Sequence, residues 1–225
     1  MTSEVAGNLA RVQAEIAAAC ARAGRAPSSV RLIAVSKTQP LELLRTALAA
    51  GQRALGENYA QELREKSDAL QGVEWHFLGS LQTNKARLVV GRAALIHTCD
   101  RAALATELAK RAAGQVQRVL IEVNVGREPQ KAGVTPEDAP ALLEQIRALP
   151  SLECRGFMCI PPVAGSGANS DPRPHFRALR ELRDRLLPGG ELSMGMSADF
   201  AVAIEEGATL VRVGTAIFGA RLPRH

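Results

Sequence analysis

Eight short runs of apolar residues alternate with segments of helical pattern along this chain of 225 residues. Their near-continuous apolar character is typical of parallel strands that helices cover on the outside. Eight such units predict a closed (β/α)8 barrel of the TIM type, an α/β fold in which residues 1–225 form a single domain. The predicted strands are RLIAVS (31–36), ALGE (54–57), EWHFLG (74–79), ALIHTC (94–99), RVLIEVNV (118–125), CRGFMCI (154–160), ELSMG (191–195) and TLVRVG (209–214).

Helical patterns fill the gaps between these strands, and an extra helix is predicted within residues 1–25. Its apolar stripe is Val5, Leu9, Val12 and Ile16, spaced for one helix face. A Gly-, Pro- and Ser-rich stretch, 161–174, is predicted to be a flexible loop. A doubly wound open sheet is the alternative fold, but no strand is followed by Gly-x-Gly-x-x-Gly. Five other helices are predicted at 40–50, 59–70, 84–90, 176–187 and 198–206. A sixth is predicted to begin after Asp100 as its cap, and a seventh to have Thr135 as its N-cap and Pro136 as its first residue. A short helical tail is predicted after the eighth strand.

Composition narrows the classes of protein that fit. With 46% hydrophobic and 23% charged residues, the chain is expected to fold by itself. The net charge of +5 is modest, and aromatic residues are only 3% of the chain, which argues against a nucleic-acid binder. Neither a signal sequence nor a run of eighteen apolar residues is found, so we expect a cytoplasmic protein without membrane contact. The four cysteines lack disulfide-type spacing and are expected to be reduced core residues.

Lys37 ends the first predicted strand, in AVSKT. Functional side chains of a barrel lie at the C-terminal ends of its strands, and a lysine next to a buried run is costly unless it is neutral, paired or covalently occupied. The alternative is a lysine whose stem is buried while its amine reaches solvent.

Two turns after the seventh and eighth strands could bind a phosphate. SMGMS contains Met196 and Ser197, and VGTA contains Gly214 and Thr215. Small residues and hydroxyls at such junctions favour a phosphate group, and barrels commonly bind phosphate with this pair of loops. Each turn could also be an ordinary helix cap. Together with Lys37 they predict a site for a phosphorylated carbonyl compound.

Three further polar residues could frame this site. Asn58 follows the second strand and could instead be a helix N-cap, and His76 in the third strand could be a buried core histidine. Arg212 lies between two valines of the eighth strand, so its guanidinium points either to a partner on a helix or into the barrel mouth.

Six segments make the chain resemble a known family. In this order and at these separations, they resemble the pyridoxal phosphate homeostasis proteins, single-domain relatives of the alanine racemase N-terminal barrel. The resemblance extends from about Leu32 to Arg221. The segments are AVSKT (34–38), GENYAQE (56–62), WHFLGSLQTNK (75–85), KAG (131–133), SMGMSADF (193–200) and VRVGTAIFGAR (211–221).

The resemblance implies a fold-type III barrel with pyridoxal 5′-phosphate held as an internal aldimine on Lys37. It further implies that Asn58 lies near the ring and that Arg212 faces the pyridine nitrogen. Ser197, beside Met196, would bind the phosphate together with Gly214 and Thr215. The expected role is storage, buffering or delivery of the cofactor, with no dedicated reaction.

Other functions stay open at this point. In the two-domain racemases that the barrel resembles, the second base is a tyrosine from a separate domain, whereas this chain has one tyrosine, Tyr59. The lack of a second tyrosine argues against a racemase, so a racemase or lyase with Lys37 as base is only the first alternative. A Schiff-base sugar-phosphate aldolase is the second alternative. A metal site at His97 and Cys99 lacks a suitably spaced third ligand. We expect a monomer whose partners are the cofactor, amino acids and apo-enzymes that use pyridoxal phosphate.

Overall fold

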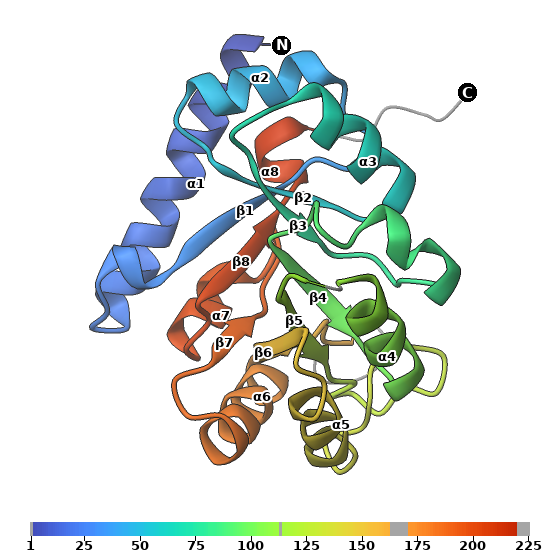
Figure 1. Cartoon of the computed structure of the whole chain (residues 1–225). Helices are drawn as coiled ribbons and strands as arrows, with labels where there is room; N and C mark the ends of the chain where they lie inside the picture. Colours follow the sequence, from blue (N-terminus) through green and yellow to red (C-terminus); the bar gives the residue numbers. More distant parts are fainter. Residues whose placement is uncertain (1, 113, 163–170, 220–225) are drawn as a thin grey trace.

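A computed structural model describes residues 2–112, 114–162 and 171–219 and confirms the predicted barrel (Figure 1). Eight parallel strands pair in sequence order, and β1 closes the ring against β8. Each strand begins within one or two residues of its predicted start. The strands are β1 (Arg31–Val35), β2 (Ala54–Glu57), β3 (Glu74–Phe77), β4 (Leu95–Cys99), β5 (Gln117–Glu122), β6 (Leu152–Met158), β7 (Glu191–Ser193) and β8 (Leu210–Val213).

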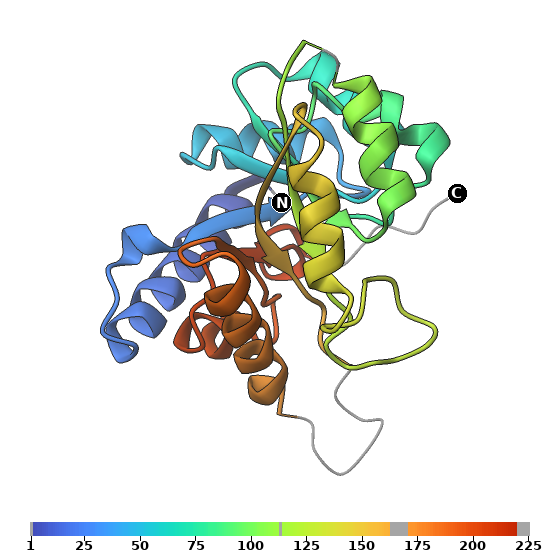
Figure 2. The ribbon, with the colours of Figure 1, turned by 60° about the horizontal axis from the view of Figure 1, so that its bottom comes forward.

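Helices surround the strands and cover their outer faces (Figures 1 and 2). The segment between β5 and α5 loops away from the barrel in Figure 2. The α-helices are α1 (Thr2–Arg22), α2 (Leu41–Ala49), α3 (Ala60–Ala69), α4 (Ala102–Arg111), α5 (Ala139–Arg147), α6 (Arg173–Leu186), α7 (Phe200–Glu205) and α8 (Thr215–Phe218), and the 3₁₀ helices are η1 (Pro27–Ser29) and η2 (Thr83–Leu88).

Several predicted helices differ from the structure in their type or their start. The predicted α-helix at 84–90 is the short 3₁₀ helix η2. Asp100 does not cap α4, because its carboxylate pairs with Arg101, which is itself the capping residue. Thr135 does accept a hydrogen bond from the Asp138 amide, but this contact forms a turn that precedes α5. The cap and first position predicted at Thr135 and Pro136 are therefore wrong.

The predicted loop 161–174 is too long at its C-terminal end. Helix α6 already begins at Arg173, where the Asp171 carboxylate accepts a hydrogen bond from the Arg173 amide at 3.0 Å. A carboxylate at this point satisfies an amide that the helix leaves unpaired. Residues 163–170 lie outside the described residues, so the flexibility predicted for them is not tested.

Buried side chains form two apolar clusters that follow the alternation of the strands. Leu32 and Ala34 belong to the large outer cluster between strands and helices, whereas Ile33 belongs to a small inner one. Since successive strand residues point to opposite faces, the inner cluster fills the barrel interior. The inner cluster is Ile33, Ala54, Leu78, Leu95, Leu120, Met158 and Leu210. This alternation determines which side chains can reach the barrel mouth.

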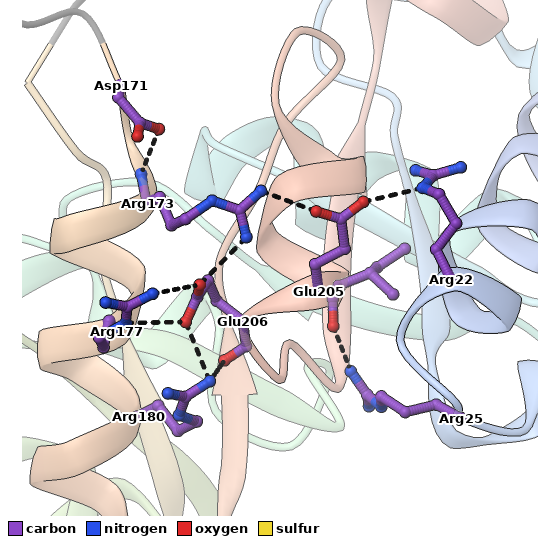
Figure 3. A network of polar contacts seen from close by, with 9 residues as sticks. Arg22, Arg25, Asp171, Arg173, Arg177, Arg180, Glu205 and Glu206 are labelled. Atoms are coloured by element: carbon purple, nitrogen blue, oxygen red, sulfur yellow. Dashed lines mark hydrogen bonds and ion pairs between the residues drawn. The ribbon is translucent and has the colours of Figure 1, made fainter.

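Arginine side chains join three helices around two carboxylates of α7 and its C-cap (Figure 3). Glu206, which is 4% exposed, accepts hydrogen bonds from Arg173, Arg177 and Arg180 of α6. Glu205 pairs with Arg173 and, at 2.9 Å, with Arg22 of α1. The Glu205 and Glu206 carboxylates thus partly neutralise the positive charge of the α6 arginines and tie α6 and α1 to α7.

All four cysteines are free; Cys20, Cys99 and Cys159 are buried as predicted, whereas Cys154 is only half-buried. In the described part of the chain, no helix has the length and apolar character needed to cross a membrane.

Candidate functional site

A cavity of about 310 Å³ opens at the C-terminal ends of the strands. The structure brings together all seven residues predicted for the site, and each of them lines this cavity. They are Lys37, Asn58, Met196, Ser197, Arg212, Gly214 and Thr215. A volume of this size is sufficient for a small cofactor. Their contact with a ligand stays a prediction.

Lys37 reaches the cavity because of its place in the alternation of β1. Ile33 points inward, so Val35 and Lys37 follow on the same side. The next residue, Thr38, has a φ of +63°, a left-handed conformation that is uncommon for a residue with a branched side chain. Such strain persists only where surrounding contacts impose it, and it is frequent at functional sites.

A buried cluster of charged groups imposes this turn from the outer side of the barrel. Lys66 of α3 donates hydrogen bonds to the Ser36 carbonyl at 2.7 Å and to the Glu57 carboxylate at 2.8 Å. Ser36 donates to the same carboxylate at 2.6 Å, and the Thr38 amide donates to Glu62 at 2.8 Å. Burial raises the pKa of Glu57, while the Lys66 ammonium lowers it. The residues on both sides of Lys37 are therefore fixed by these contacts.

Arg212 points into the barrel mouth, which is one of the two orientations that the sequence allowed. Its Nη1 donates to Ser193 Oγ at 2.6 Å and its Nη2 to the Cys159 carbonyl at 2.9 Å. Burial lowers its pKa from the ordinary value of an arginine, and the Glu122 carboxyl is among the groups that raise it. Since a guanidinium has five N–H donors, these two bonds leave donors for a ligand in the cavity.

Two hydroxyl groups meet at the predicted phosphate position. Thr215 Oγ1 donates to Ser197 Oγ at 3.2 Å, which joins the loop after β7 to the start of α8. Met196 is held by its amide, which donates to Asp199 at 2.6 Å, while its side chain is 39% exposed at the rim. A Cβ added to Gly214 would lie only 3.2 Å from the Val35 carbonyl oxygen. A glycine here allows β8 and β1 to approach closely below the hydroxyl pair.

Asn58 lies at the end of β2 and lines the cavity, but it does not cap α3, whose N-cap is Tyr59. Its Oδ1 is buried without a hydrogen-bond partner among the described residues. A buried acceptor without a partner is costly, so a donor brought by a ligand would satisfy it. Close packing holds Asn58 in place, since a Cβ on Gly79 would lie 2.0 Å from the Asn58 carbonyl oxygen.

The sequence did not point to Glu122, the last residue of β5. Burial raises the pKa of its carboxyl to about 7, and Asp100 adds to the effect while Arg212 opposes it. Its Oε2 has no partner within the described ranges. An inward carboxyl at a strand end could have been suspected from the alternation of β5, in which Leu120 belongs to the inner cluster.

Six residues that line the cavity were also not singled out from the sequence. Val35 and Leu78 could have been found because they lie on inward positions of their strands. Gln39, Ile160, Ala198 and Gly219 lie in loops, where no periodicity indicates direction. All six line the same cavity.

The histidines do not form the metal site that was considered. His97 lies inside the barrel and contacts His76 and Ser193, whereas Cys99 packs in the outer cluster. Within the described ranges, no three His, Cys, Asp or Glu side chains are grouped as metal ligands. His76 is buried in the barrel interior and does not line the cavity at the C-terminal ends of the strands. It is therefore a core histidine, which was the second possibility raised by the sequence.

The model of the family described as alanine racemase, N-terminal domain, matches residues 7–222, which is nearly the whole chain. The barrel is therefore of the alanine racemase N-terminal type. Alanine racemase from Corynebacterium glutamicum superimposes with a TM-score of 0.75 over 97% of this chain and 62% of that one. At 18% identity, this likeness shows the fold alone.

Closer relatives identify the branch. The pyridoxal phosphate homeostasis protein of Aquifex aeolicus is 49% identical over 224 residues, which is 95% of this chain and 96% of that protein. The structure of PipY from Synechococcus elongatus, solved with pyridoxal phosphate bound, has a TM-score of 0.80 at 38% identity, covering 96% of this chain and 100% of that one. The chain belongs to the family of pyridoxal phosphate homeostasis proteins.

Proposed function

We propose that this protein binds pyridoxal 5′-phosphate in the barrel mouth, covalently through Lys37, and serves in keeping the cofactor available in the cell by storage, buffering or delivery. The observation that carries the proposal is that Lys37, Arg212 and the hydrogen-bonded Ser197–Thr215 pair line one cavity. The relatives named above support it, because one of them was solved with this cofactor.

The residues present fit the group. Lys37 supplies the amine for the aldehyde, and the Ser197 and Thr215 hydroxyls can donate to the phosphate. Arg212 supplies a donor for the pyridine nitrogen. The buried Oδ1 of Asn58 has no hydrogen-bond partner among the described residues, and a donor on a ring substituent could fill this place. When bound, the cofactor supplies an aldehyde that exchanges amines and a ring that accepts electrons.

An absorbance spectrum of the protein as purified tests this function. We expect a visible band, and its loss after denaturation should be accompanied by release of pyridoxal phosphate in an amount close to one per chain. A colourless protein that also gains no band on addition of the cofactor would refute the proposal and leave the aldolase alternative.

Thr215→Val is expected to weaken binding of pyridoxal phosphate about 10- to 100-fold, as for loss of a hydrogen bond to a charged group. Binding of pyridoxal, which lacks the phosphate, should change little. Equilibrium dialysis of both ligands measures the difference. Thr46→Val on α2, where the hydroxyl donates within its own helix, is the matched control. Equal losses for both ligands would show that Thr215 is only a helix residue.

We propose that the protein is not a dedicated racemase or lyase. Tyr59 is the one tyrosine of the chain and is 43% exposed at the end of β2. Proton exchange on both faces of a bound amino acid needs two bases, and Lys37 supplies one. Arg212 stays protonated, so a ring nitrogen that accepts its hydrogen bond has no proton and is a poorer electron sink. The likeness of the fold to alanine racemase favours the alternative, a racemase or lyase with Lys37 as base. Turnover of any amino acid at enzyme-like rates would establish that alternative.

The remaining expectations on partners are part of this proposal. Amino acids can reach Lys37 through the open mouth of the cavity, and apo-enzymes that use pyridoxal phosphate are the proposed recipients. A monomeric state, a cytoplasmic location and the absence of nucleic-acid and membrane partners also stay predictions.

A further inference from the structure

A line of buried hydrogen bonds crosses the barrel interior, starting from Arg212. Ser193 Oγ lies 2.6 Å from Arg212 Nη1 and 2.8 Å from His97 Nδ1. His97 Nε2 lies 2.8 Å from His76 Nδ1, and His76 Nε2 lies 3.2 Å from Glu74 Oε1. We call these five residues the interior chain: Arg212, Ser193, His97, His76 and Glu74.

The interior chain connects opposite ends of the barrel. Its members come from β8, β7, β4 and β3, and each occupies an inward position of its strand. Arg212 lines the cavity at the C-terminal end, whereas Glu74 and His76 line a hollow of about 150 Å³ with Arg31, Arg118 and Arg155. Apolar residues would fill this interior without desolvating polar groups, so the polar line calls for another reason.

The two ends of the interior chain have fixed roles. Arg212 can only donate, and the ionised Glu74 can only accept. The hydrogen bond from His76 is the main cause of a lowered Glu74 pKa, and burial keeps the pKa of His97 well below its ordinary value, so His97 is neutral. A neutral imidazole has one donor and one acceptor nitrogen, so His97 can bond to Ser193 and to His76 at the same time.

Ser193 Oγ accepts a hydrogen bond from Arg212 Nη1, and its 2.8 Å contact with His97 Nδ1 holds the hydroxyl at this position. The Cys159 carbonyl, at 2.9 Å from Nη2, holds the other arm of the guanidinium. Two acceptors at fixed positions define the plane of a guanidinium, and hence the direction of its remaining N–H groups.

We infer that Ser193 and His97 are positioning residues, which orient Arg212 so that it donates to the ring nitrogen of the bound cofactor. The inference rests on the proposed function and adds to it a specificity for the nitrogen atom. A ligand whose ring has a carbon at this place would lose the hydrogen bond and leave a buried N–H donor without an acceptor.

The test compares pyridoxal phosphate with 1-deaza-pyridoxal phosphate, in which a carbon replaces the ring nitrogen. Wild-type protein is expected to bind pyridoxal phosphate about 10- to 100-fold more tightly than the deaza compound. Ser193→Ala, which removes only the hydroxyl, should bring this ratio close to one by weakening pyridoxal phosphate binding alone. His97→Gln keeps a donor and an acceptor in the chain and should retain most of the ratio.

Thr98→Val is the matched control. Thr98 is the neighbour of His97 on β4, and its buried hydroxyl donates to the Gly79 carbonyl at 2.7 Å, outside the interior chain. This variant should keep the wild-type ratio, whatever its thermal stability. Dialysis gives both affinities, and thermal unfolding without ligand confirms that each variant is folded.

Three outcomes would overturn the inference, and they differ from one another. A Ser193→Ala protein that loses affinity for both compounds equally would show that the interior chain is only structural. Wild-type protein that binds both equally would show that Arg212 does not serve the ring nitrogen, although the proposed function stands. Wild-type protein that binds neither would refute the proposed function itself.

Discussion

Lys37→Ala is expected to abolish the visible absorbance band of the protein loaded with pyridoxal phosphate, because the only amine that β1 directs into the cavity is removed. The barrel should stay folded, since Ser36 and Thr38 keep their contacts with Lys66, Glu57 and Glu62. Absorbance after incubation with the cofactor and circular dichroism measure the two effects.

Lys131→Ala is the matched control for this variant. Lys131 lies in the loop before α5, where it donates to the Pro161 carbonyl at 3.1 Å, and it does not line the cavity. Borohydride reduction of the wild type, followed by peptide mass analysis, should place the cofactor on Lys37. An adduct on Lys131 or Lys85 would contradict the assignment.

Lys66→Met is expected to lower the free energy of unfolding by about 3–5 kcal/mol near neutral pH, as found when one partner of a buried ion pair is removed. Lys66 is 8% exposed, and Glu57 beside it is fully buried with one oxygen, Oε2, that has no partner among the described residues. The variant should also bind the cofactor more weakly, because the turn that carries Lys37 loses its outer contacts. Urea denaturation and dialysis measure the two losses.

The stability loss of Lys66→Met should depend on pH. Without the ammonium, the pKa of Glu57 rises further above its ordinary value of 4.5. A carboxyl whose pKa is higher in the folded state favours folding less as pH rises, so the loss is full above the folded pKa and shrinks as pH falls towards 4.5. Lys110→Met on the exposed face of α4 is the control and should show no such dependence. A loss that is the same at all pH values would mean that Glu57 is not the cause.

The strand order and most element bounds could be predicted because they follow from local periodicity. Leu32, Ile33 and Ala34 form a continuous apolar run that only a strand covered on both faces would need. The predicted cap at Asp100 failed because tertiary context decided it: Arg101 binds both the Asp100 carboxylate and the Leu81 carbonyl, from a loop twenty residues earlier. Local capping rules contain no information about such a partner.

The site residues could be predicted in part, for a similar reason. Lys37, Ser197 and Thr215 follow strand ends, and in a barrel all strand ends of one kind meet at the same mouth. The supports behind them could not be predicted. Lys66 reaches Ser36 only because α3 packs back across β1 and β2, and His97 meets Ser193 across 96 residues of sequence. Contacts across the barrel depend on its closure and on side-chain direction, which periodicity does not specify.

Closure also places α1 where a helix between β8 and β1 would lie. It packs against α2, α7 and α8, and Asn8 donates to the Ile217 carbonyl at 3.0 Å. These partners are 209 residues apart, so a helix made before the eight strands contacts a segment made after all of them. Until β8 has emerged, β1 has an unpaired edge and α1 an uncovered apolar face, both of which promote association with other chains. Because contacts between distant residues form slowly, the ring is expected to close late during folding, and chains that terminate early should depend most on protection by chaperones.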